Sequence, residues 1–280
     1  MKLVHTLLFL MREGSLFEDL DLAKTCLRSL QKSSEKTVVV YNQGFYTNDQ
    51  LREFLRGYCL DAHVIGGGEN TGTTVGRQSC FEYIWQTFGD VRFISELHMD
   101  MVFAPHWEDA LTEYLETHEE PVIGCGIVNA SGELPFSGRT VPLPEAGGGD
   151  EGFLLGLRED RVVRGFTCPC VHVSEILKAT GGYNPQFLKG KQCFEDDSML
   201  LGYYYYYGTK AGWYPKVSYA SVVYHAVAGQ RIGLGDSVTV NLNGLIRQYG
   251  AMGLRHLSEL HQSPWHKRFF SAQCQAYSSM

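Results

Sequence analysis

The sequence predicts one α/β domain with a central, mostly parallel sheet flanked by helices, and a smaller second lobe. Apolar runs of strand length alternate along the chain with segments whose apolar residues recur at helical spacing. This order is typical of strand–helix–strand units. Several of the apolar runs end at glycine-rich or amide-rich turns. With 280 residues, the chain is long enough to form one large domain of this class.

The N-terminal part shows the alternation most clearly. Residues 5–11 form an apolar run of strand length, and apolar residues then recur at helical spacing over 20–30. Residues 37–41 are continuous, apolar and β-branched, as expected of a strand that is buried on both faces of a parallel sheet. A second helix is predicted over 51–58, and a third strand over 62–65 stops at three consecutive glycines.

The next unit brings polar side chains to the end of a strand. A glycine-rich loop over 69–78 leads into an amphipathic helix whose apolar residues extend from Phe81 to Phe88. A strand is predicted over 91–95, and it runs directly into a polar cluster over 96–100. Because open α/β sheets bind ligands at the carboxyl ends of their strands, this cluster predicts a binding site.

The second half of the sequence is less regular. The pattern weakens between 126 and 165, where glycines and prolines are frequent, and a long surface loop is predicted there. Ordered elements are predicted after this loop over 174–180 (helix), 196–207 (helix, through a run of five tyrosines) and 217–224 (strand). We expect a domain that covers 1–245 and a tail, partly helical and then loose, that covers 246–280.

Composition and charge exclude some classes of partner. The formal net charge of −7 gives no broad basic surface for nucleic acid. The apolar run over 7–11 is too short for a transmembrane segment and no cleavage site follows it, so we expect a cytoplasmic protein. The eight cysteines include no C-x-x-C pair, and Cys168-Pro169-Cys170 departs from that spacing. They are interpreted as reduced, mostly buried thiols.

Motifs in the middle and late parts of the sequence resemble those of family 2 glycosyltransferases. Residues 93–100, followed by Pro105-His106-Trp107-Glu108, are similar to the family's strand end with a D-x-D motif and its following Pro-Gly-Trp segment. The family then shows a glycine turn, a Glu-Asp pair that opens a helix, and a late histidine. This sequence has Gly181-Gly182-Tyr183-Asn184, Glu195-Asp196 and His225 in the same order. The resemblance implies the GT-A fold, with the smaller lobe on the acceptor side.

The resemblance implies an inverting glycosyltransferase of the hexosyltransferase type. A sugar would pass from a nucleoside diphosphate donor, UDP-linked by default, to a hydroxyl acceptor, which could be a glycan or a lipid-linked or protein-linked molecule. Asp196 would be the general base that deprotonates the acceptor hydroxyl, with Glu195 as the second choice. Without the flanking motifs, the carboxylates of residues 195–197 would be interpreted as favourable charges at a helix N-terminus.

A divalent metal ion, Mn²⁺ or Mg²⁺, is the implied cofactor. Asp100 matches the second aspartate of the D-x-D motif, and its carboxylate suits a hard cation that neutralises the departing diphosphate. His98 stands where the family has its first aspartate, and an imidazole shifts the preference toward Mn²⁺. His225 resembles the late histidine that completes the metal shell. On its own, this histidine would be interpreted as a hydrogen-bonded structural residue.

Three further polar residues resemble nucleotide-binding positions of the family. Asn42 lies in the turn after the second predicted strand, and Asn70 and Arg77 lie in the glycine-rich segment and the helix that follows it. With His98 and Asp100, they would contact the uracil, ribose or phosphates of the donor. Each of the three is explained equally well as a turn residue or a member of a surface ion pair.

Two other functions stay open on the sequence alone. A sugar nucleotidyltransferase shares the nucleotide-binding sheet, but it carries an early glycine-rich segment with Arg and Lys, for which this chain offers only Met11-Arg12-Glu13-Gly14. A non-catalytic nucleotide-sugar-binding relative is suggested by His98 at a metal-ligand position. Trp107, Trp213 and most of the tyrosine run are interpreted as packing residues.

Overall fold

The computed structural model describes residues 1–145, 148–208, 212–226 and 235–278. The N-terminal elements are β1 (Leu3–Phe9), the short 3-10 helix η1 (Glu13–Ser15), α1 (Leu16–Leu30), β2 (Thr37–Asn42), α2 (Asn48–Arg56), β3 (Asp61–Ile65), α3 (Thr73–Thr87) and β4 (Phe93–Leu97). The central elements are β5 (Met101–Phe103), α4 (Asp109–Thr117), β6 (Val122–Asn129), β7 (Glu133–Leu134), β8 (Arg139–Thr140), α5 (Glu151–Gly156) and β9 (Val162–Arg164). The C-terminal elements are β10 (Cys170–Val173), α6 (Ser174–Thr180), α7 (Glu195–Tyr207), β11 (Lys216–His225), α8 (Ser237–Leu260) and α9 (Pro264–Ser278).

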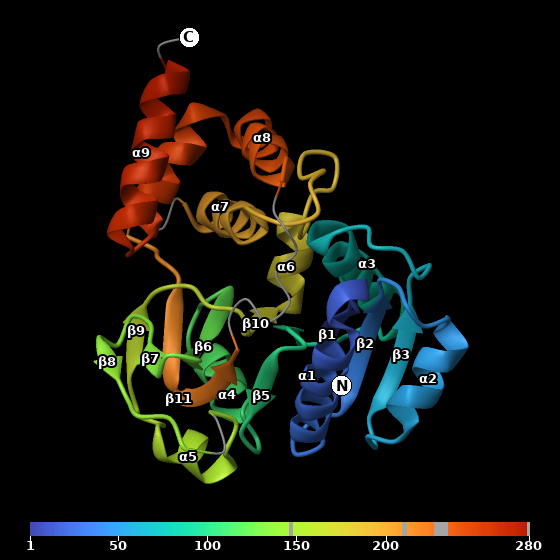
Figure 1. Cartoon of the computed structure of the whole chain (residues 1–280). Coiled ribbons are helices and arrows are strands. Elements are labelled where there is room, and N and C mark those ends of the chain that lie inside the picture. The colour runs from blue at the N-terminus through green and yellow to red at the C-terminus, as the bar shows by residue number, and fades with distance from the viewer. Residues whose placement is uncertain (146–147, 209–211, 227–234, 279–280) are drawn as a thin grey trace.

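One large sheet forms the centre of the molecule (Figure 1). Within the described residues it has nine strands in the order β3-β2-β1-β4-β10-β6-β11-β5, and β9 also pairs with β11. The neighbours β3, β2, β1 and β4 are parallel, as are β6 and β11, whereas β10, β5 and β9 pair antiparallel to their neighbours. The predicted α/β class, with a mostly parallel sheet flanked by helices, is confirmed.

Side chains of the parallel strands alternate between two cores. Leu3 and Leu7 of β1 pack with α1, α2 and α4, whereas Val4 between them packs with α3, α6 and α7. In β2, Val38 belongs to the first core and Val39 to the second. Successive side chains of a strand point to opposite faces of the sheet, so strands covered on both faces need continuous apolar runs. This is why residues 37–41 could be recognised as a buried strand.

The prediction of a long loop between residues 126 and 165 was wrong. This segment contains the end of β6, the two-stranded hairpin β7–β8, α5 and β9. Leu134 and Leu154 from it are buried against Val217 and Tyr219 of β11, and together they form a third core. Elements of two to six residues give too few repeats for a periodic pattern to be visible. Gly147, part of the predicted loop, lies outside the described residues.

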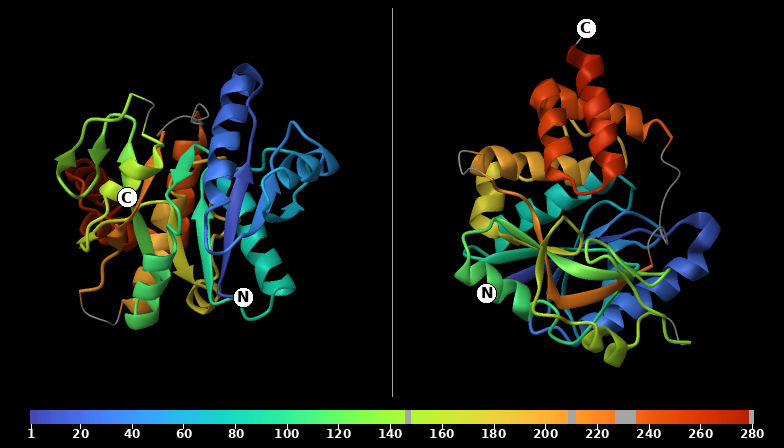
Figure 2. Two further views of the ribbon diagram at one scale, coloured as in Figure 1. Left: turned by 90° about the horizontal axis from the view of Figure 1, so that it is seen from below. Right: turned by 90° about the vertical axis from the view of Figure 1, so that its left-hand side faces the viewer.

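The C-terminal helices pack on α7 rather than forming a loose end. Figures 1 and 2 show α7, α8 and α9 gathered at one end of the molecule, and their apolar residues form a fourth core. Within the described residues, the predicted C-terminal tail, expected to be partly helical and then loose, is helical in α8 and α9. α8 bends at Gly250 and passes through residue 245 without a break, so the division into 1–245 and 246–280 stays a prediction. No helix among the described residues combines the length and apolarity needed to cross a bilayer.

Candidate active site

Two strand ends meet at one edge of the sheet. β4 leads into His98 and Asp100, after which β5 begins at Met101. β5 pairs antiparallel with the end of β11, in a register that sets Met101 opposite His225. The Ala226 amide donates a hydrogen bond to the Asp100 carbonyl (3.0 Å). The strand register therefore places His225 next to Asp100, although the two residues are far apart in sequence.

His98, Asp100 and His225 form a group that can hold a metal ion. One donor atom of each residue lies within 4.8 Å of the donor atoms of the other two. His225 Nε2 lies 3.2 Å from Asp100 Oδ1, and the two imidazole rings are 5.5 Å apart. Burial acts to raise the pKa of Asp100, but the hydrogen bond and charge of His225 outweigh it, and the pKa is lowered. Two imidazole nitrogens and a carboxylate oxygen are suitable ligands for a divalent metal ion.

A thiol lies beside the first of these histidines. Cys168 Sγ donates to the Glu96 carbonyl at 3.5 Å and contacts the side chains of His98 and Cys170. Burial acts to lower the pKa of His98, but the Cys168 thiol and the Asp100 carboxylate raise it to about 9. Of the eight cysteines, four are buried, three are partly buried and one is exposed.

A second acidic group opens α7. Glu195, Asp196 and Asp197 occupy its first turn, where the helix dipole favours negative charge. The preceding Phe194 has a left-handed backbone with φ 61°, which turns the chain into the helix. Asp196 is open to solvent, whereas Asp197 is buried and its Oδ1 lies 2.6 Å from Nε2 of His261. The helix thus presents Asp196 as its accessible carboxylate.

The surroundings raise the pKa of the first two of these acids. Protein atoms displace water from Glu195 and raise its pKa to about 7, and its Oε2 has no hydrogen-bond partner among the described residues. Although Asp196 is exposed, partial loss of water around its carboxyl and the charge of Glu195 raise its pKa well above the ordinary value. Both carboxyls also feel the charge of His98. The start of α7 therefore lies close enough to His98 to be considered with the metal-binding group as one candidate site.

Asn42 and Asn70 shape the loops at the same edge. Asn42 is fully buried, and its amide donates to the Tyr46 carbonyl (2.9 Å) and to the Asn48 side chain (2.8 Å). Asn70 accepts a hydrogen bond from the Gly72 amide (3.0 Å) just before α3. Both side chains hold turns in place, as Asn often does. A direct contact of Asn42 with a nucleotide would require it to leave its present partners, and both assignments stay predictions.

Arg77 lies beneath the site rather than at its surface. It is 1% exposed, and it donates to the Thr6 carbonyl (2.9 Å) and to the carbonyl of Leu97. Its Nε lies 3.2 Å from Glu96 Oε2. A buried guanidinium held in this way ties β1 to the end of β4, and the predicted contact with the nucleotide would require these bonds to break. The nucleotide assignment of Arg77 also stays a prediction.

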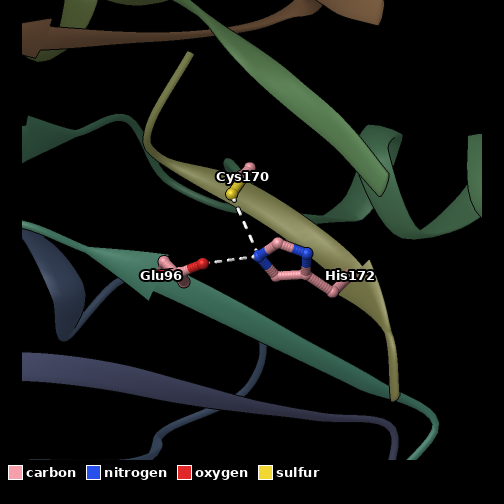
Figure 3. Close-up of side chains that lie close together, drawn as sticks. All are labelled: Glu96, Cys170 and His172. Atoms are coloured by element: carbon pink, nitrogen blue, oxygen red, sulfur yellow. Dashed lines mark hydrogen bonds and ion pairs between the residues drawn. The ribbon is translucent and has the colours of Figure 1, made fainter. Parts of the chain in front are cut away.

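A buried hydrogen-bond network around Glu96 was not anticipated from the sequence. His172 Nε2 lies 2.8 Å from Glu96 Oε1 and 3.1 Å from Cys170 Sγ, and Figure 3 shows the ring of His172 turned toward both. His172 Nδ1 contacts the Tyr203 hydroxyl (2.7 Å), and the Tyr183 hydroxyl donates to Glu96 (3.0 Å). Although burial opposes it, these bonds and the charge of Arg77 lower the pKa of Glu96. A lone histidine in an apolar strand gave no signal of this network.

Comparison with solved structures defines the fold. No protein-family model and no curated protein sequence matches the chain. S. aureus TarS, residues 1–349, in complex with UDP-GlcNAc aligns with a TM-score of 0.60 at 14% identity, over 98% of this chain and 72% of that one. GalNAc-T7 with UDP, GalNAc and Mn²⁺ aligns with a TM-score of 0.60 at 11% identity, over 98% of this chain and 54% of that one. The chain has the GT-A fold.

The similarity has defined limits. A longer S. aureus TarS structure aligns with a TM-score of 0.57 at 14% identity, and 98% of this chain covers only 43% of it. The chain therefore spans less than half of that relative. At these identities, the likeness shows the fold and leaves the chemistry to the residues of the site.

Proposed function

We propose that the chain is a glycosyltransferase that transfers a sugar from a UDP-sugar to a hydroxyl acceptor with inversion, assisted by a divalent metal ion. One observation carries this proposal. His98, Asp100 and His225 converge beside the acidic start of α7, at the carboxyl edge of a GT-A sheet, where α/β folds bind ligands. The neighbours in complex with UDP-GlcNAc, and with UDP, GalNAc and Mn²⁺, support a nucleotide-sugar donor and a metal-assisted reaction of the hexosyltransferase type.

Each group has a defined role in this reaction. The metal ion, when bound, neutralises the charge that the diphosphate gains as it leaves. His98, Asp100 and His225 would hold the ion, and His225, which lowers the pKa of Asp100, favours the charged form of that carboxylate. Asp196, the accessible acid of α7, accepts the proton of the attacking hydroxyl, and its raised pKa makes it a stronger base than an ordinary carboxylate. Glu195 is the second choice for the base.

Binding of UDP with Mn²⁺ tests the donor and metal together. A ligand at 100 times its dissociation constant stabilises a protein by ~2.7 kcal/mol, so we expect UDP with Mn²⁺ to raise the melting temperature by several degrees. Asp100→Asn should lose most of this shift because the amide is a weaker metal ligand. Asp49→Asn, which alters an exposed carboxylate on α2, is the matched control and should keep the shift.

Two outcomes would change the assignment. A wild-type protein whose melting temperature does not respond to UDP with Mn²⁺, and which releases no UDP from UDP-sugars, is not a glycosyltransferase of this kind. A normal thermal shift without any UDP release from UDP-GlcNAc or UDP-glucose would instead favour the non-catalytic relative. An Asp100→Asn protein that keeps the full shift would move the metal site away from this strand end.

A further inference from the structure

A cavity of about 240 Å³ opens beside Asp196. It lies between the start of α7, the tip of the β7–β8 hairpin, the chain after β9 and the turn between α8 and α9. Asp196 and Asp197 are on its wall. Pockets that enclose drug-sized ligands measure ~300–1,000 Å³, so this cavity has room for a single ring. Whatever binds there lies against the candidate base.

The aromatic side of the cavity is held by an unusual backbone. Phe136, at the tip of the hairpin, has a left-handed backbone with φ 66° and is 38% exposed. Its ring lies against Gly165, where an added Cβ would come within 2.8 Å of the ring atoms. Phe166 is also on this wall. A bulky residue with positive φ is strained, and such strain concentrates at functional sites. The hairpin therefore presents an apolar ring to the cavity.

Polar residues of the wall come from the C-terminal helices and the turn between them. His261, Gln262, Ser263 and His266, from the α8–α9 turn and the start of α9, are part of the wall. The rings of His261 and His266 stack at 4.6 Å. Nδ1 of His266 is buried and has no hydrogen-bond partner within the described ranges. These side chains offer both hydrogen-bond donors and hydrogen-bond acceptors, as a ligand rich in hydroxyls requires.

The charge of the cavity disfavours anions. It carries the carboxylates of Asp196 and Asp197, and no lysine or arginine is among the described residues that line it. Arg164, next to the lining Gly165, donates instead to the backbone carbonyls of Glu259 and Leu260. A phosphate, sulfate or carboxylate in the cavity would meet like charges, and like charges in contact oppose binding. A neutral ligand meets no such penalty.

We propose that this cavity is the acceptor site and that it binds one ring of a neutral saccharide. The apolar C–H face of the sugar would lie on Phe136, its hydroxyls would bond to the α8–α9 turn, and one hydroxyl would face Asp196. The proposal rests on the proposed glycosyltransferase function, and it names the class of acceptor. When transfer occurs, the hydroxyl oxygen forms the bond to the anomeric carbon, the bond to the diphosphate breaks, and Asp196 receives the proton.

A glycan array tests the class of ligand. The wild-type protein, with UDP and Mn²⁺ present, is applied to an array that carries neutral, phosphorylated, sulfated and carboxylated glycans. We expect binding to neutral glycans. The dissociation constant of the strongest neutral ligand is then measured by calorimetry for three variants. Phe136→Ala should weaken binding about 10-fold, because an aromatic contact contributes ~0.5–1.5 kcal/mol. Phe136→Tyr keeps the ring and should bind as the wild type does.

Controls separate this proposal from the proposed function. Phe17→Ala removes another exposed ring, which is 87% exposed on α1, and should leave glycan binding unchanged. All variants should keep the thermal shift with UDP and Mn²⁺. Binding of charged glycans alone, binding of no glycan, or equal binding by Phe136→Ala would overturn the cavity assignment. Neutral glycan binding without any response to UDP would refute the donor proposal and leave the cavity as a saccharide site.

Discussion

Asp196 is exposed to solvent, and its surroundings raise its pKa above the ordinary value. Its side chain is accessible, whereas Asp197 is paired with His261 and Glu195 is partly buried. A general base contributes ~10²–10⁴-fold to a reaction, so Asp196→Asn should lower UDP release from UDP-GlcNAc or UDP-glucose by about that factor. Because the base acts on the acceptor, the dissociation constant for UDP with Mn²⁺ should change less than about 3-fold.

The variant Glu195→Gln provides the comparison for this assignment. It leaves Asp196 in place, so a smaller loss of UDP release is expected from it. The reverse order, with Glu195→Gln the more damaging change, would make Glu195 the base. Equal loss of UDP binding in both variants would show that these acids support the donor site rather than the acceptor.

Glu195 makes stability depend on pH in a predictable direction. Its pKa is about 7 in the folded protein and ~4.3 in an unfolded chain. Between these values the folded state binds more protons, so stability falls as pH rises from about 4.5 to 7. Glu195→Gln removes this loss of stability because the amide does not titrate. In EDTA, the free energy of unfolding of the variant should equal that of the wild type at pH 4.5. At pH 8 it should be higher by on the order of 1–2 kcal/mol, measured by urea unfolding.

If the difference in free energy of unfolding between Glu195→Gln and the wild type did not change with pH, this explanation would be contradicted. The control is Glu53→Gln on α2, whose side chain is 70% exposed, and its stability relative to the wild type should not vary over the same range of pH. Because the comparison is made between two pH values, any constant effect of the amide on packing cancels.

The sequence indicates candidate site residues more readily than the side chains that support them. Asp100, Glu195 and His225 lie in short motifs next to predicted element ends, so local patterns were enough to select them. The approach of His225 to Asp100 depends on the pairing of β5 with β11, which no local pattern encodes. The network of His172 around Glu96 is formed by side chains from separate strands and helices. Single buried polar residues of this kind give no periodic signal.

At the scale of elements, α8 holds the loop that leads into α7. Asn241 of α8 is fully buried, accepts from the Gly190 amide and donates to the Cys193 carbonyl (2.8 Å). One turn later, an added Cβ at Gly244 would overlap the carbonyl oxygen of Phe187. Gly244→Ala should therefore push α8 from the loop and lower the free energy of unfolding by ~1–3 kcal/mol, measured by urea unfolding.

A second glycine gives the matched control for this prediction. Gly156 lies at the end of α5 and has nothing within 4 Å of an added Cβ, so Gly156→Ala should be neutral or slightly stabilising. The Gly244→Ala protein should also release UDP more slowly, because the displaced loop precedes Asp196. A variant as stable as the wild type would mean that α8 does not set the position of this loop.

The elements that could be predicted are those whose own apolar pattern is visible in the sequence. The helix over 174–180 was predicted with its observed bounds, and the strand over 217–224 was predicted to within one residue at each end. The hairpin β7–β8 and the strand β9 were missed, because each is only two or three residues long. Their positions depend on β11 and the third core rather than on their own sequence. The proposed acceptor cavity is bounded by these short elements, so it could not be predicted.

At the scale of the whole molecule, the two halves of the sheet carry different parts of the site. The parallel strands β3, β2, β1 and β4 end at the loops of Asn42, Asn70 and His98. The second half supplies His225 from β11 and, through α7 and the C-terminal helices, the acids and the proposed acceptor cavity. The candidate site therefore draws on both halves of the sheet, and the proposed acceptor cavity also draws on α8 and α9.

The C-terminal helices should be necessary for folding, and truncation tests this. Leu200 and Leu201 of α7 are buried in one core with Leu254, Leu257 and Phe270. Burial of one such side chain contributes ~1.5–3 kcal/mol, so losing residues 246–280 costs an amount comparable to a total stability of ~5–15 kcal/mol. A chain that ends at residue 245 should lack a cooperative melting transition in circular dichroism, and one that ends at 262 should melt at an intermediate temperature. Melting of the shorter chain within about 2 °C of the full chain would make 246–280 a separate tail.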